Sequence, residues 1–181
     1  MPEFSEPAPR ARWTDFLWLL LFPIHFVLGT ARHEASHALA GLAQGASIAE
    51  YSILPSGRGW GYVRLDRLPS GWLVPAAPYL CDVLTFGLGC FLCMRLPGRF
   101  RGLFINVLGL MVLSPLVNSA NAYNGGLRGR GDVGYLLQIL PPIAVNVSFV
   151  AALAVYLVGT WLLLTRSPVA LQPRIGDTRG T

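Results

Sequence analysis

The chain has 181 residues, of which 53% are hydrophobic and only 13% are charged, whereas about 25% of the residues of a soluble domain are charged. This composition excludes a disordered chain, which needs low hydrophobicity and high charge. The net charge is +5, and all 14 basic residues are arginines. The arginines lie singly or in small groups between apolar runs, which is typical of residues that flank membrane spans and argues against nucleic acid as a partner. The sequence therefore predicts an integral membrane protein with the lipid bilayer around it.

Four apolar segments are long enough to cross a bilayer. The first covers residues 16–43, and as a helix its 28 residues would extend about 42 Å at 1.5 Å per residue. A hydrocarbon core is about 30 Å thick, so this helix can span the bilayer and still project at one end. The other segments run over residues 72–94, 103–120 and 142–164.

A change of pattern separates the first two spans. Residues 47–54 and 60–65 are rich in β-branched and aromatic side chains, and residues 55–59 between them have the Pro, Ser and Gly of a turn. We therefore expect a small β-hairpin, either lying plainly at the membrane interface or offering a strand edge to an extended peptide. The fold class predicted is an all-α polytopic membrane protein with about four transmembrane helices and this hairpin after the first.

The expected domain organisation is simple. Residues 1–166 would form a single membrane-embedded domain. Residues 167–181 are polar and include two prolines, so they are expected to form a mobile C-terminal tail.

The sequence His33-Glu34-Ala35-Ser36-His37 is an HExxH motif. By composition, this pattern would arise by chance in roughly one such chain in a thousand. Residues four apart share a face of a helix, so both imidazoles can reach one metal ion, and zinc is the metal that this motif typically holds. Glu34 lies beside them, as a general base for the attacking water must.

A catalytic zinc site needs a third protein ligand, and no further His or Cys follows the motif on its helix. Asp132, in the loop after the third apolar segment, should lie on the same side of the membrane as the motif and is the favoured candidate. Asp82, inside the second segment with no obvious partner, is the rival, and Glu50 and Asp66 near the hairpin are expected to be solvated. His25 lies two helical turns before the motif and about 80° around the helix, so we expect it to be a satisfied polar group.

The run RHEASHALAGLAQGASIAEYSILPSGRGWGYVRL resembles the beginning of site-2-protease-type intramembrane zinc metalloproteases, especially their compact bacterial branch. The resemblance extends over about residues 31–65. Two positions depart from the family pattern: Ser36 stands where the family usually has glycine, and Asp132 lies in Gly-Asp-Val-Gly rather than Leu-Asp-Gly.

The resemblance implies zinc held by His33, His37 and an aspartate from a later helix, which points to Asp132, with Glu34 as the general base. It implies that Asn118 and Asn121, with Asn124, lie where family asparagines hold substrate or a helix break. It also implies a bacterial cytoplasmic membrane and a zinc site towards the cytoplasm, although the arginine distribution weakly favours the opposite orientation.

The function expected from these features is zinc-dependent hydrolysis of peptide bonds of membrane-protein or peptide substrates in or near the bilayer. Two alternatives stay open. One is an inactive relative whose metal site serves structure or the binding of a client protein. The other is a metal transporter in which His25 and Asp82 form a polar path across the membrane.

Overall fold

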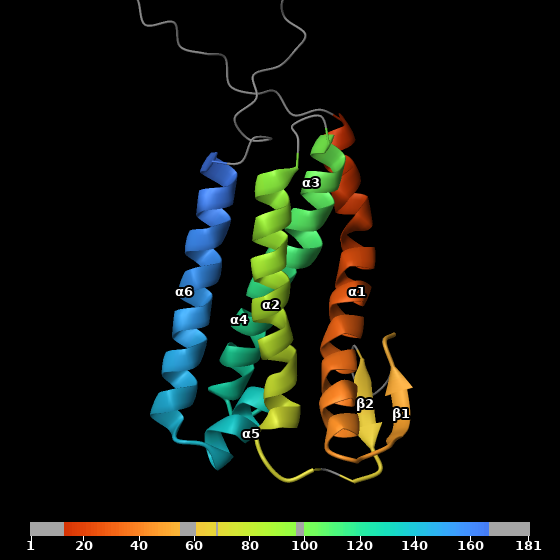
Figure 1. Cartoon of the computed structure of the whole chain (residues 1–181), viewed down its shortest axis with the longest axis vertical. Coiled ribbons are helices and arrows are strands. Elements are labelled where there is room, and N and C mark those ends of the chain that lie inside the picture. Colours follow the sequence, from red (N-terminus) through yellow and green to blue (C-terminus); the bar gives the residue numbers. More distant parts are fainter. Residues whose placement is uncertain (1–12, 55–60, 68, 97–99, 167–181) are drawn as a thin grey trace, which may run out of the picture.

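The computed structural model describes residues 13–54, 61–67, 69–96 and 100–166, and most of them are helical. The long helices are α1 (Trp13–Ala43), α2 (Leu73–Arg95) and α6 (Pro142–Arg166). A further continuous helix is made of α3 (Arg101–Val107), the π-helical segment η2 (Leu108–Leu113) and α4 (Ser114–Gly126). Within these described ranges, three helices are long and apolar enough to cross a membrane, namely Leu73–Arg95, Arg101–Gly126 and Pro142–Arg166. Together with α1 they form the predicted helical membrane bundle (Figure 1).

The helix borders differ from the predicted ones mainly in the third span. That span was expected to end at residue 120, but α4 continues to Gly126. Pro23 and Pro78 lie inside α1 and α2 without ending them. A proline inside a membrane helix is tolerated where neighbouring groups satisfy the backbone carbonyl that it leaves without a donor.

The predicted β-hairpin is present after α1. Strands β1 (Ile48–Ser52) and β2 (Tyr62–Leu65) pair antiparallel, with Tyr51 opposite Val63. They pack against the C-terminal half of α1 (Figure 1). The turn predicted at residues 55–59 lies outside the described residues, as does the tail at residues 167–181.

The base of the hairpin is closed by Asp66. Its carboxylate accepts hydrogen bonds from the hydroxyl and the backbone N–H of Ser47, at 2.6 and 2.8 Å, and from the backbone N–H of Arg67 at 2.7 Å. These bonds hold the pKa of Asp66 below its usual value, and the bond from the Ser47 hydroxyl has the largest effect. Asp66 therefore has a local structural role, as its expected place near the hairpin suggested.

The loop expected around Asp132 is instead a short helix, α5 (Gly131–Ile139). Gly129 and Gly131 have φ of 71° and 65°, a left-handed conformation that glycine adopts at little cost. They let the chain reverse after α4. Gly134 then packs so closely that a Cβ there would lie 2.7 Å from the carbonyl carbon of Gly129. The reversal brings α5 to the same end of the bundle as the hairpin (Figure 1).

The helices pack around apolar side chains and leave others facing outward. One buried cluster joins α2, α3, η2 and α6 and consists of Phe86, Cys93, Phe104, Val112, Tyr156 and Leu163. A second cluster joins α5 and α6 and consists of Val133, Leu136, Val145 and Phe149. Large apolar side chains such as Leu84 and Ile143 are 74% and 79% exposed, as suits a surface that faces lipid rather than water.

Candidate metal centre

The two histidines of the HExxH motif lie on one face of α1. Because His33 and His37 are four residues apart, their side chains are neighbours one turn apart on the helix. Their rings meet edge to face, with centroids 4.9 Å apart. His37 is buried and His33 is half-buried. One helix face therefore presents two shielded imidazoles to the same place.

The third member of the group is Asp132, in the first turn of α5. Its Oδ2 atom lies 3.4 Å from Nε2 of His33 and 3.1 Å from Nε2 of His37. The three candidate ligand atoms all lie within 4.8 Å of one another. Two ligands that each lie about 2.0–2.1 Å from a tetrahedral zinc ion are roughly 3.3 Å apart. The donor set and the spacing from carboxylate to imidazole thus fit a single metal ion.

Asp132 is the anionic member of this group. Burial raises the pKa of Asp132, but hydrogen bonds from His33 and His37 outweigh burial and hold that pKa well below its usual value. The carboxylate is therefore ionised at neutral pH, as a metal ligand must be.

The backbone of α2 fixes the orientation of the His37 ring. Nδ1 of His37 donates a hydrogen bond of 2.8 Å to the carbonyl oxygen of Val74. In an α-helix that carbonyl would accept from the N–H of the residue four positions later, which here is Pro78 and has none. The proline leaves the carbonyl free for His37. With Nδ1 bonded to Val74, the nitrogen that faces Asp132 is Nε2, which donates a hydrogen bond of 3.1 Å to that carboxylate. Loss of the Nε2 proton gives the neutral tautomer that binds metal through Nε2.

Tyr79 contacts both chain segments that form the group. Its ring meets that of His33 edge to face, with centroids 5.9 Å apart. Its hydroxyl lies within hydrogen-bonding reach of Asp132. Tyr79 therefore helps to fix the relative positions of α1, α2 and α5 at this end of the bundle.

Glu34 lies next to the group without belonging to it. The backbone N–H of Val63, in β2, donates a hydrogen bond to its carboxylate. A Cβ added at Gly61 would lie 3.3 Å from Cγ of Glu34, so the hairpin backbone approaches this side chain closely. The hairpin thus holds the carboxylate of the predicted general base beside the two histidines.

A cavity of about 360 Å³ extends from Glu34 along α1. His33, Asn118 and Asn121 line it near the metal group, and the remaining wall is mostly apolar. Both asparagines predicted to bind substrate therefore border this cavity. The geometry offers a largely apolar space with amide groups beside the metal group.

His25 also lines this cavity, about 12 Å from His33 at 1.5 Å per residue. Its Nε2 donates a hydrogen bond of 3.0 Å to Oδ1 of Asn106, whose own amide nitrogen donates to the carbonyl oxygen of Gly102. His25 is thus a satisfied polar group, as predicted, and it lies outside the metal group.

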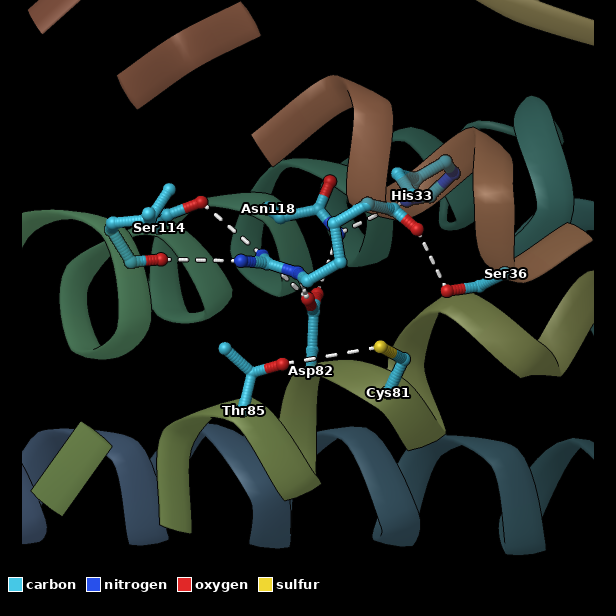
Figure 2. A network of polar contacts seen from close by, with 9 residues as sticks. His33, Ser36, Cys81, Asp82, Thr85, Ser114 and Asn118 are labelled. Carbon is cyan, nitrogen blue, oxygen red and sulfur yellow. Dashed lines mark hydrogen bonds and ion pairs between the residues drawn. The ribbon is translucent and has the colours of Figure 1, made fainter. Parts of the chain in front are cut away.

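The rival ligand Asp82 also lies outside the metal group. It is 1% exposed and forms an ion pair of 2.7 Å with Arg32, one residue before the motif (Figure 2). We did not predict this partner from the sequence. The available signal was that charges at membrane depth pair with one another, and Arg32 is the cation in the first apolar segment.

Within the described part of the chain, His33, His37 and Asp132 thus form a group that could hold a metal ion, beside a carboxylate and a cavity. No protein-family model, curated protein or solved structure matches the chain.

Proposed function

We propose that the chain is a zinc-dependent intramembrane endopeptidase of the site-2-protease type. The observation that carries this proposal is the convergence of His33, His37 and Asp132 next to Glu34, which lines a largely apolar cavity together with His33. Two imidazoles and one carboxylate leave one position of a tetrahedral ion open, which is the pattern of catalytic rather than structural zinc. The resemblance of residues 31–65 to that family supports the same function.

In this proposal His33, His37 and Asp132 hold the zinc ion, which would supply Lewis acidity to a peptide carbonyl and to water. Glu34 takes a proton from the attacking water and passes it to the nitrogen of the leaving amine. The Val63 N–H orients the Glu34 carboxylate for both steps.

The substrate would enter as an unwound segment, because a helical backbone has its carbonyls engaged in hydrogen bonds. The cavity is mostly apolar, which suits side chains from a membrane-embedded segment. Asn121 would offer an amide donor and acceptor to the exposed peptide groups, and Asn118, whose amide nitrogen is engaged by Asp82 and His33, would offer its carbonyl oxygen. The substrate class proposed is therefore membrane proteins with a transmembrane segment that unwinds easily.

The direct test is Glu34→Gln. We expect this variant to bind zinc as the wild type does and to lose at least about 100-fold in the rate of peptide hydrolysis, since general base catalysis contributes that much or more. The assay uses purified protein in detergent and a labelled single-span peptide with a Gly-Pro pair in its span. Metal content is measured alongside.

Gln44→Glu is a suitable control, because it changes an amide just after the end of the same helix, whose side chain bonds locally to the carbonyl oxygen of Ala40. It should leave hydrolysis near the wild-type rate. If Glu34→Gln cleaves the peptide as fast as the wild type, the proposed function is wrong. If zinc binds but neither protein cleaves, the metal site serves structure or client binding.

The transport alternative receives less support from the contacts. Asp82 would have to attract a passing cation, yet Arg32 neutralises it at 2.7 Å. Zinc flux into proteoliposomes that survives Glu34→Gln but is lost in His25→Ala would favour transport over hydrolysis.

A further inference from the structure

The cavity that begins at Glu34 has a buried polar group on its wall far from the metal group, the imidazole of His25. This side chain is 9% exposed. Its Nε2 donates a hydrogen bond of 3.0 Å to Oδ1 of Asn106, which satisfies the N–H of the ring. Polar atoms in buried positions usually have a hydrogen-bond partner, and the second ring nitrogen, Nδ1, is the atom that needs one.

The contacts of Asn106 determine which nitrogen of His25 carries the proton. Nδ2 of Asn106 donates to the carbonyl oxygen of Gly102 at 2.8 Å. A carbonyl oxygen only accepts, so the atom of Asn106 that faces His25 is the amide oxygen, which also only accepts. The donor between the two side chains is therefore Nε2 of His25. A neutral imidazole carries its proton on one nitrogen, which leaves Nδ1 as a hydrogen-bond acceptor.

The two ring nitrogens of His25 face different spaces. Asn106, the partner of Nε2, lines a separate apolar groove of about 290 Å³ between α1, α3 and η2. Nδ1 faces Gly109, which lines the cavity that leads to Glu34. A Cβ at Gly109 would lie 3.0 Å from Nδ1, so glycine leaves space beside the lone pair. Among the described residues, no donor is bonded to Nδ1, and the acceptor is turned towards the cavity.

The backbone that faces this imidazole belongs to η2 and is held by α1. In η2 the N–H of Ser114 bonds the carbonyl of Gly109, five residues back. The next bond in that register would come from Pro115, which has no N–H. Nη1 of Arg32 donates instead to the carbonyl oxygen of Leu110, at 3.1 Å, and Nη2 donates to the Ser114 hydroxyl at 3.2 Å. The space beside the acceptor is therefore bounded by a fixed stretch of backbone.

The distance from the metal group sets which part of a substrate can reach this acceptor. His25 and His33 are eight residues apart on α1, which is about 12 Å along the helix. An extended chain advances about 3.3 Å per residue. A substrate with its scissile bond at the metal group would therefore have its fourth residue beside His25. The apolar wall between them, formed by side chains such as Phe26 and Val117, offers no acceptor of its own.

We propose that Nδ1 of His25 accepts a hydrogen bond from the substrate about four residues from the scissile bond, on the side that enters the cavity. The donor is a side-chain hydroxyl or a backbone N–H that unwinding has freed. A donor without an acceptor is costly in apolar surroundings, so this contact would select where along its span a substrate is cut. The inference rests on the proposed function, and it makes His25 a residue that determines specificity.

The test uses pairs of labelled single-span peptides that differ in one donor. The first pair has threonine or valine, which are nearly equal in shape, and the second has an amide or an ester bond, which removes the backbone N–H. Each change is placed in turn at the third, fourth and fifth residue on either side of the cleaved bond, which mass spectrometry locates. We expect kcat/KM to be about 3–10-fold lower without the donor, as is typical of one neutral hydrogen bond, near the fourth residue on one side. The pair that responds identifies the source of the donor.

Three variants of the full chain, purified in detergent, connect this preference to the imidazole. His25→Leu should abolish it, and the ratio within a pair does not depend on the fraction of protein that is folded. Gly109→Ala should weaken it, because the added Cβ covers Nδ1 while the bond to Asn106 remains. Leu113→Ala changes an apolar side chain of the same cavity and is the control. It should alter kcat/KM for both members of a pair alike.

A binding measurement separates this inference from the proposed hydrolysis. The same peptides are titrated with zinc-loaded Glu34→Gln protein, with and without His25→Leu, and fluorescence anisotropy gives the dissociation constants. A preference for the donor that His25→Leu removes supports the contact even if the wild-type chain cleaves no peptide, in which case hydrolysis alone is wrong. Equal values within both pairs, or a preference that persists in His25→Leu, would overturn the inference and leave the proposed hydrolysis untouched.

Discussion

The two ends of the bundle are held together in different ways. At the hairpin end, α1 presents Arg32, His33 and His37, and each of these side chains has a defined polar partner on another helix. At the opposite end, where α3 lies (Figure 1), α2, α3 and α6 meet through apolar side chains such as Phe104 and Leu163. The hairpin end therefore adds individual polar contacts to the apolar cluster of α5 and α6, whereas the other end depends mainly on filled volume. Substitutions should affect metal binding at the first end and stability at the second.

The largest effect expected on stability is at the apolar end. Phe104→Ala removes a ring that is 5% exposed, and truncation of a buried phenylalanine costs about 3–5 kcal/mol in the free energy of unfolding. Zinc affinity should stay at the wild-type value. Leu103→Ala, its exposed neighbour on the same helix, should change stability little. Tryptophan fluorescence during denaturation measures both variants, and a loss of zinc affinity in the folded Phe104→Ala protein would contradict the separation of the two ends.

Asp132→Ala is the converse change at the hairpin end. It removes the anionic ligand candidate, so zinc affinity should fall by about 100-fold or more, because loss of a ligand costs at least as much as loss of its supporting partner. That factor corresponds to about 2.7 kcal/mol. Asp66→Asn, which alters an exposed carboxylate near the hairpin, serves as the control and should bind zinc normally. Equal affinities in the two variants would remove Asp132 from the metal group.

Gly126→Ala should produce a smaller effect that reaches both properties. A Cβ there would overlap the side chain of Val133 in α5, so α5 must shift and carry Asp132 with it. Overpacking of this kind costs about 1–3 kcal/mol, and zinc affinity should fall as well. At Gly125 the nearest atom to an added Cβ is 3.9 Å away. Gly125→Ala should therefore be silent in thermal denaturation and in zinc titration, and a silent Gly126→Ala would show that α5 adjusts freely.

Much of the architecture could be predicted because it depends on local pattern. Apolar runs of sufficient length gave the spans, and the spacing of His33 and His37 gave one helix face. The order of the spans also put Asp132 at the same end as the motif. These features follow from periodicity and length, which a single chain displays directly.

Contacts between distant segments could not be predicted in this way. The pairing of Arg32 with Asp82 joins residues 50 positions apart, and nothing in the sequence near Asp82 indicates its partner. Helix α5 is too short to stand out as a periodic pattern, so the sequence predicts a loop there. Where α5 begins depends on two left-handed glycines and on close packing against α4. The use of the Val74 carbonyl by His37 depends on how α1 and α2 pack side by side, which local pattern does not encode.

The prolines of the membrane helices have a consequence beyond helix geometry. Pro78 and Pro115 each subtract one donor from their own helix, and in both places α1 supplies the replacement, through His37 and Arg32. Each missing N–H leaves one backbone carbonyl unpaired at a fixed position, and a side chain of α1 bonds to it. In a bilayer, water cannot compete for these carbonyls. The two hydrogen bonds therefore fix both the rotation and the depth of α1 relative to the helices that it contacts.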